Sequence, residues 1–388
     1  MKNMIKKLLP CMAAALLSAC AGPGEDYHTE GMKLYSEGKY SQAQELLAQA
    51  VAADNRKALY YVDLGMNCIQ TADYKQAKDN FDRALIIGGE DELAYRGLGI
   101  MALDQELWAD AVSYFTQAVD AIDMEVGPLE VDILKYKAYA HKKAGEYDEA
   151  LGAYQALIEL GDDRVENTFA KGDVCLLMGK EEEARTYFDE VIKLSNDVSY
   201  YIAIYNSYSA RKLYAQGAGY LNKALVVEGS SDDAHLNRGM IYYIMGNYEN
   251  AVTEFSYPYE SADADKAAKA AMYTALCREK QKLYSEAISA YVYSLKKKDD
   301  PQVNNYYAMC LARTGEYNLA WNVIHTAIET YPDCECMQDM MWNEIVLYEK
   351  MEMFPSAYTR LTEYLKIYPG DAVTEKEMAF LKLKMGTA

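Results

Sequence analysis

Residues 145–150 read Gly-Glu-Tyr-Asp-Glu-Ala, and the pattern Gly-x-Tyr-x-x-Ala returns along the chain at Gly38, Gly246 and Gly315, with weaker copies between them. We call the third place of this pattern the aromatic position. Its ten occurrences are Tyr40, Tyr74, Trp108, Tyr147, Glu181, Tyr214, Tyr248, Tyr284, Tyr317 and Phe354. Successive copies lie 33 to 39 residues apart, most often 33 or 34. A steady period of this length indicates repeated structural units.

Two other positions repeat with the same period. Nine residues before the aromatic position, most units carry a small residue, among them Gly31, Gly65, Gly99, Ala138, Gly172 and Gly239. Seven residues after it, all ten units carry a large apolar residue: Leu47, Phe81, Phe115, Tyr154, Phe188, Leu221, Phe255, Tyr291, Ile324 and Leu361. This spacing predicts two helices per unit, with the small residue letting the first helix approach the second and the large residue filling the groove between units. The tyrosines at the aromatic position, Tyr214 among them, are expected to pack in the core.

With these residues the chain resembles the tetratricopeptide repeat (TPR) family from about residue 24 to residue 369. The resemblance implies an all-α fold, a right-handed α-solenoid of about ten helix-turn-helix repeats. Pro258 is expected to end the second helix of the seventh repeat early. Residues 370–388 are predicted to form a C-terminal capping helix, because Thr374 to Lys384 reads as one amphipathic helix.

The first twenty residues have the pattern of an export signal. Lys2, Lys6 and Lys7 precede a short apolar run, and Leu17-Ser18-Ala19-Cys20 resembles a bacterial lipobox. We therefore expect a cleaved lipoprotein signal peptide over 1–19, a lipidated Cys20, and a short tether over 20–26. Two acyl chains would hold the protein at the cell membrane or outer membrane, facing outside the cytoplasm.

Composition argues against several functions. The formal net charge of −20 becomes −23 once the three lysines of the signal peptide leave, and such a chain repels nucleic acid. We find no catalytic constellation, no metal-binding motif and no cofactor-binding motif. His141 and His325 fall in predicted helices and are read as packed or surface residues.

Six cysteines remain after Cys11 leaves and Cys20 takes lipid. Cys68, Cys175, Cys277 and Cys310 are predicted to be small buried hydrophobic residues. Cys334 and Cys336 lie in a loop, and the simplest interpretation is a pair of unpaired thiols. Metal binding, redox activity and a strained disulfide are the alternatives.

The family resemblance implies that the first helix of each repeat lines a concave groove. Counting from sixteen residues before each aromatic position, the groove candidates are Arg96, Lys135, Tyr139, Lys142, Asn206, Asn237, Tyr243, Asn305 and Trp342, together with Met240 and Met309. The asparagines would clamp the backbone of an extended peptide. The three basic residues would form a positive spot suited to a carboxylate or an acidic segment.

These observations favour a non-enzymatic, membrane-anchored scaffold that binds a protein or peptide partner in the bacterial cell envelope. One alternative is a lipoprotein that binds a small molecule or a glycan on its aromatic side chains. A second is an enzyme with an unrecognised site. Since a fold does not dictate function, the repeats alone predict only an interaction role.

Overall fold

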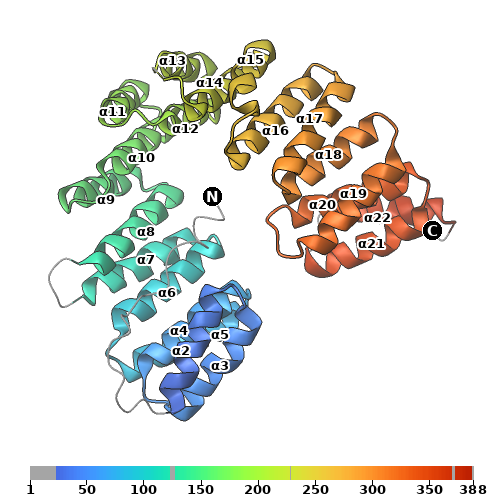
Figure 1. The fold of residues 1–388 in the computed structure, drawn as a ribbon. Helices are drawn as coiled ribbons and strands as arrows, with labels where there is room; N and C mark the ends of the chain where they lie inside the picture. The colour runs from blue at the N-terminus through green and yellow to red at the C-terminus, as the bar shows by residue number, and fades with distance from the viewer. Residues whose placement is uncertain (1–22, 123–126, 228, 369–371, 387–388) are drawn as a thin grey trace. The chain divides into compact units, whose positions relative to one another are not determined.

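A computed structural model describes residues 23–122, 127–227, 229–368 and 372–386. These residues form 21 α-helices and contain no strand, which confirms the all-α prediction (Figure 1). The signal peptide over 1–19 and the lipidation candidate Cys20 lie outside the described residues. No helix in the described ranges combines the length and the apolar character needed to cross a membrane.

The chain divides into two compact units, one formed by the described residues up to 200 together with 207–212, the other by 201–206 and the residues from 213 onward. The helices of the first unit are α2 (Pro23–Ser36), α3 (Tyr40–Ala53), α4 (Ala58–Gln70), α5 (Tyr74–Ile87), α6 (Asp91–Asp104), α7 (Trp108–Asp120), α8 (Pro128–Ala144), α9 (Tyr147–Glu159), α10 (Arg164–Leu177) and α11 (Glu181–Leu194). Helix α12 (Val198–Ser209) contributes residues to both units.

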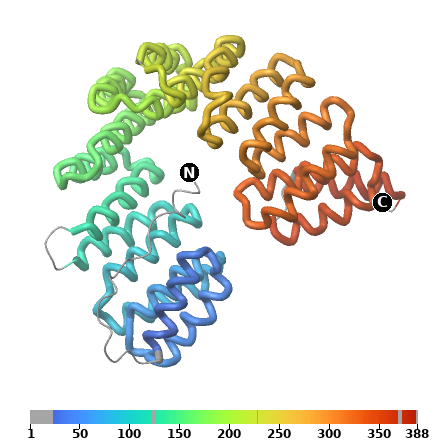
Figure 2. Tube along the Cα trace, in the orientation of Figure 1, coloured from blue at the N-terminus to red at the C-terminus, as the bar shows by residue number. Residues whose placement is uncertain are grey.

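The second unit continues the same arrangement. Its helices are α13 (Tyr214–Leu225), α14 (Asp232–Ile244), α15 (Tyr248–Tyr259), α16 (Ala264–Lys280), α17 (Tyr284–Lys297), α18 (Pro301–Arg313), α19 (Tyr317–Thr330), α20 (Met337–Lys350), α21 (Phe354–Ile367) and α22 (Ala372–Lys384). Within each unit every helix packs mainly on its neighbours in sequence, and the backbone trace follows one hairpin after another (Figure 2). The described helices thus make ten pairs followed by the predicted C-terminal helix.

Each second helix begins at an aromatic position, from α3 at Tyr40 to α21 at Phe354. Two residues earlier, the backbone of every turn has a positive φ. Glycine fills this place in five repeats, and Ala72, Glu106, Lys212, Lys282 and Glu352 fill it in the others. Because a side chain in this conformation is strained, the glycine of the repeat pattern is explained by the turn itself.

The small and large positions of the pattern meet in the core. A Cβ built on Gly239 would lie 2.4 Å from Cε1 of Phe255, and one on Gly99 would lie 2.5 Å from Cε1 of Phe115. All ten large apolar residues are buried. The sequence prediction of close approach at one position and groove filling at the other is confirmed.

Three details differ from or refine the predictions. Helix α2 already starts at Pro23, so residues 23–26 are not a tether; a proline with Glu25 and Asp26 in the first turn favours a helix start. Tyr214 was expected in the core with the other aromatic positions, but it is 58% exposed. Helix α15 ends at Tyr259, one residue after Pro258, as predicted.

Candidate functional site

The three basic candidates of the first unit are all engaged by aspartates. Arg96 Nε on α6 lies 2.6 Å from Asp132 of α8. Lys135 Nζ of α8 lies 2.7 Å from Asp162, in the loop before α10. Each pair joins one repeat to the next, and Arg96 is itself buried.

Lys142 of α8 completes this set at Asp173 of α10. Its Nζ lies 2.5 Å from Asp173, and Arg211 Nη1 approaches the same carboxylate at 3.1 Å. Burial alone would raise the pKa of Asp173, but the two cations outweigh it and hold the pKa below its ordinary value. The prediction of a positive spot is therefore wrong, because aspartates of neighbouring repeats neutralise the three basic side chains.

Tyr139 stands beside these pairs on α8. It is half-buried, burial raises the pKa of its hydroxyl, and Lys143 Nζ lies 5.9 Å from its ring centre. Lys143 also lies 5.1 Å from the ring of Trp108. Part of the Tyr139 side chain is exposed, and its role in ligand binding stays a prediction.

The asparagine and tryptophan candidates differ in how far their side chains are exposed. Asn206 on α12 is exposed, and Asn237 on α14 is half-buried. Asn305 on α18 is buried and accepts a hydrogen bond from Asn343 Nδ2 at 2.9 Å, so the prediction that it clamps a peptide is wrong. Trp342 on α20 packs on Tyr364, with ring centres 5.7 Å apart, and is partly buried.

Tyr243 lines an open groove of about 600 Å³ in the second unit. The groove lies along the first helices of three successive repeats, α14, α16 and α18. Besides Tyr243, its lining residues are Met272, Tyr273, Leu276, Glu279, Lys280, Gln302, Tyr306, Met309 and Arg313. Of these, only Tyr243 and Met309 were counted as groove positions from the sequence. We call this the tyrosine groove.

The tyrosine groove is mostly apolar with a paired charge at its edge. The rings of Tyr243 and Tyr273 meet edge to face, with centres 5.9 Å apart. Burial raises the pKa of both hydroxyls and of Tyr306, so all three are uncharged hydrogen-bonding groups at neutral pH. Arg313 Nε lies 3.4 Å from Glu279, which also accepts a 2.5 Å hydrogen bond from Tyr291.

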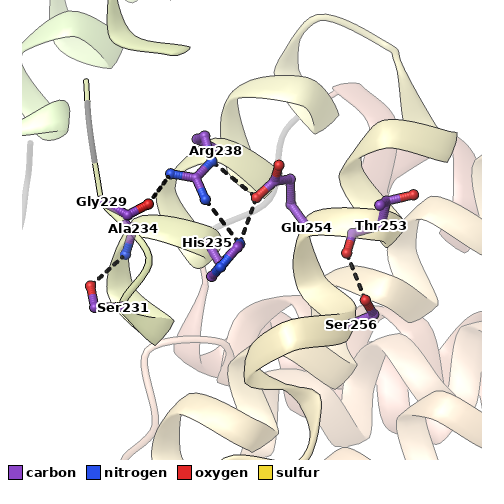
Figure 3. Close-up of polar contacts among 8 residues, drawn as sticks. All are labelled: Gly229, Ser231, Ala234, His235, Arg238, Thr253, Glu254 and Ser256. Atoms are coloured by element: carbon purple, nitrogen blue, oxygen red, sulfur yellow. Dashed lines mark hydrogen bonds and ion pairs between the residues drawn. The ribbon is translucent and has the colours of Figure 1, made fainter. Parts of the chain in front are cut away.

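A polar network fixes the start of α14, the helix that carries Asn237 and Tyr243 (Figure 3). Glu254 Oε2 of α15 lies 2.8 Å from His235 Nδ1 and 3.0 Å from Arg238 Nε. Arg238 also donates to the carbonyl of Gly229, and the Ser231 hydroxyl oxygen accepts from the backbone N–H of Ala234. These charged groups pair with one another and with the backbone, so their role is to hold α14 in place.

The cysteines follow the prediction. Cys68, Cys175, Cys277 and Cys310 are buried, and burial raises the pKa of each thiol, to about 12 for the last two. Cys334 and Cys336 are free thiols whose sulfurs lie 3.4 Å apart. Across the described ranges, no three or more His, Cys, Asp or Glu side chains gather as a metal site would require.

The histidines lie in helices as expected. His141, buried on α8, lies 2.7 Å from Glu146, and His325 on α19 stacks on Trp321 and lies 2.7 Å from Glu344. Glu344 is itself buried and also meets Arg360 at 2.6 Å. These contacts join helices within a unit.

Family comparisons agree with this architecture. Models of the tetratricopeptide repeat match residues 62–123, 137–198 and 232–256. The chain contains tetratricopeptide repeats. The matched TPR segments cover most of α4 to α11 and the pair α14 and α15, and the helices around them continue the same alternation of first and second helices.

Two curated relatives show the level of similarity. A TPR repeat-containing protein of Methanocaldococcus jannaschii is 24% identical over 249 residues, which are 61% of this chain and 42% of that protein. The cell division cycle protein 16 homolog of Homo sapiens is 24% identical over 195 residues, 49% of this chain and 31% of its own length. The chain thus spans less than half the length of these curated relatives. The crystal structure of yeast Tom70 aligns with 94% of this chain and 89% of its own, at 15% identity and a TM-score of 0.48.

Proposed function

We propose that this protein is a membrane-anchored lipoprotein that acts as a non-enzymatic protein-interaction scaffold in the bacterial cell envelope. The observation that carries the interaction role is the tyrosine groove. We propose that it holds an extended segment of a protein partner along α14, α16 and α18.

The lining of the groove suits a peptide. Tyrosine offers a large apolar face together with a polar tip, and methionine adapts its shape to an apolar contact. Tyr243, Tyr273 and Tyr306 supply the first property, and Met272 and Met309 supply the second. Aromatic side chains in partly desolvated grooves commonly dominate the binding energy of interfaces. An apolar side chain of the partner would enter between the rings, and its backbone would meet the tyrosine hydroxyls.

The charges of the groove fit binding rather than chemistry. Glu279 is held by Arg313 and by the Tyr291 hydroxyl, so each of its two oxygens already has a partner. Lys280 and Arg313 outnumber this single carboxylate on the groove wall. The favoured partner segment is therefore apolar at its centre and neutral or acidic beside it.

The anchor is proposed from the sequence of the first twenty residues. A basic start, a short apolar run and Leu17-Ser18-Ala19-Cys20 favour lipidation of Cys20 and a position at the cell membrane or outer membrane, outside the cytoplasm. Labelling cells with radioactive palmitate tests this: label on the wild type that Cys20→Ser abolishes, together with release of the variant from membranes, would support the anchor. Equal membrane binding of both proteins would contradict it.

The groove is tested by crosslinking cells that express the tagged protein and identifying what co-purifies from solubilised membranes. Tyr273→Ala and Tyr306→Ala should each lose a stoichiometric protein partner, while Tyr214→Ala, an exposed tyrosine of the same unit, should keep it. A partner retained by both groove variants would refute the assignment. Absence of a protein partner, with thermal stabilisation of the purified protein by glycans, would favour glycan binding instead.

A further inference from the structure

The connection between α19 and α20 holds two thiols in contact. Cys334 and Cys336 are both free, and their sulfurs lie 3.4 Å apart. A disulfide bond joins two sulfurs at about 2.05 Å, so a small movement of the two side chains would close the gap. The four other described cysteines lie inside helices and are buried, which shields them from reagents in solution.

The backbone fixes the positions of this thiol pair. Cys336 is the N-cap of α20, and its carbonyl accepts a 2.9 Å hydrogen bond from the N–H of Met340. The carbonyl of Cys334 accepts a 3.1 Å hydrogen bond from the N–H of Met337. Because both cysteines are already ordered, joining their sulfurs should cost less chain entropy in the folded protein than in the unfolded chain.

The two thiols differ in their access to solvent. Cys336 is only 7% exposed and lies in an apolar cluster with Ala308, Ile324 and Met340, whereas Cys334 is half-buried. Burial, and after it the contact with the Cys334 thiol, raises the pKa of Cys336 above its ordinary value. Since the thiolate is the nucleophile in disulfide chemistry, a reagent from solution meets Cys334 first, and Cys336 stands protonated beside it.

We propose that Cys334 and Cys336 form a reversible disulfide by exchange with an external disulfide. The Cys334 thiolate attacks one sulfur of that molecule, a mixed disulfide forms, and the first external thiolate leaves. Cys336 then loses its proton and attacks the Cys334 sulfur, which releases the second external thiolate. The two cysteines lose two electrons, the external disulfide gains them, and the two protons of the cysteines end on the two thiols released.

The expected bridge is an exchanging one. It closes a loop of only three residues, and a disulfide stabilises a fold less when its loop is short. The half-buried sulfur of Cys334 leaves the bridge open to attack by thiols, and accessible disulfides are the ones that exchange. Zinc, the other common ligand of paired thiols, takes about four ligands, but no three His, Cys, Asp or Glu side chains gather within the part of the chain that the structure describes.

The test uses the full chain with Cys11→Ser and Cys20→Ser, so that the six described cysteines are its only thiols. The reduced protein, in a non-ionic detergent, is equilibrated with 2-hydroxyethyl disulfide at a fixed concentration of 2-mercaptoethanol. The probe is uncharged, because the exposed carboxylates of Asp333 and Glu335 would repel an anionic disulfide. After an acid quench, the protein is unfolded, alkylated and digested with trypsin for mass spectrometry.

The tryptic peptide 314–350 contains Cys334, Cys336 and no other cysteine. It should become two hydrogen atoms lighter and lose both alkylation sites, while Cys277 and Cys310 in the same sample keep their thiols. Half of the peptide should be oxidised at a disulfide concentration at least about threefold lower in the folded protein than in the same chain unfolded in urea. A folded protein that needs as much disulfide as the unfolded chain, or more, would overturn the proposal.

Two single variants test the order of attack. Cys336→Ser should stop at a mixed disulfide between Cys334 and one molecule of 2-mercaptoethanol. Cys334→Ser should form the corresponding adduct on Cys336 at least about tenfold more slowly, because that thiol is buried and protonated. Circular dichroism of both variants checks that the helix content is unchanged. Equal rates in two folded variants would contradict the assignment of Cys334 as the attacking thiol.

Discussion

In five repeats a glycine of the first helix packs on the large apolar residue of the second, and the contribution of this contact to stability can be measured at Gly239. A Cβ at this position would lie 2.4, 2.6 and 2.8 Å from three ring atoms of Phe255, well inside the ~3.5–4.0 Å of an ordinary carbon contact. Phe255 is fully buried, so its ring has no open space to enter. Gly239→Ala must therefore push α14 away from α15.

The size of the effect follows from two opposing terms. Overpacking of a closed core costs up to about 3 kcal/mol, and replacing a helical glycine by alanine returns about 1 kcal/mol. We expect Gly239→Ala to lower the free energy of unfolding by about 2 kcal/mol, measured by urea unfolding followed by circular dichroism. Hydrogen exchange should quicken first in α14 and α15.

Gly219 supplies a matched control within the same unit. It lies exposed in α13, and a Cβ there would meet nothing within 4 Å. Gly219→Ala should raise the free energy of unfolding by about 0.5–1 kcal/mol, opposite in sign to Gly239→Ala. If both substitutions stabilise the protein alike, the close-approach argument is refuted.

A second substitution tests the cause. In the first repeat the large apolar position holds Leu47 in place of a phenylalanine. A Cβ on Gly31 would lie 3.0 Å from Leu47, a less severe overlap than the 2.4 Å between a Cβ on Gly239 and Phe255. Gly239→Ala should therefore cost less in a Phe255→Leu background than in the wild type. Equal costs in both backgrounds would mean that the Phe255 ring is not what the new methyl group meets.

Other predictions concern the turns, the ion pairs and the titratable groups. Lys282→Gly should stabilise the second unit by up to about 1 kcal/mol in urea unfolding, since φ is +62° there and lysine is strained in that conformation. Asp173→Asn should lower the melting temperature at pH 7, where the ionised carboxylate contributes; the difference from wild type should fade in acid as the pH drops through the lowered folded-state pKa. In the native protein iodoacetamide should label half-exposed Cys334 long before buried Cys277, and peptide mass spectrometry after denaturation should show equal labelling. Burial and the nearby carboxyl of Glu377 raise the pKa of Glu349 to about 7. Because the folded protein binds this proton more tightly than the unfolded chain, the melting temperature should fall as the pH rises from about 4.5 to 7. Glu349→Gln should remove that fall.

The helix starts could be predicted from the sequence because one constraint recurs ten times. Every turn has a positive φ two residues before the second helix, and most repeats set a small residue against a large one. A weak copy of the pattern such as Leu283-Tyr284 would predict nothing by itself, but its spacing from the other copies identifies it as a helix start. The same reasoning predicts Tyr214 in the core, and this prediction is wrong because the first side chain of a helix can lie at the surface.

The partners of the groove residues could not be predicted in this way. Periodicity assigns Arg96 and Asp132 to neighbouring first helices, 36 residues apart, but their contact depends on the rotation of each helix and on side-chain rotamers. Asn305 satisfies the spacing rule and is nevertheless buried against Asn343. Tyr273 and Tyr306, which line the tyrosine groove, occupy the same place as Asn237, eleven residues before the aromatic position, so the repeat register could have identified them. Spacing predicts which face a residue occupies and leaves its neighbours undetermined.

These contacts indicate which side chains are available to bind a partner and which are already engaged within the protein. In the first unit the basic candidates bind aspartates of adjacent repeats, and removing them for a partner would cost each pair its charge-assisted hydrogen bond. In the second unit the tyrosine groove keeps uncharged aromatic surface exposed to a ligand. Partner binding there should depend on apolar burial, which salt strengthens or leaves unchanged, and hardly on charge pairs, which salt weakens. An affinity that falls steeply between low and high salt would place recognition on the charged helices of the first unit instead.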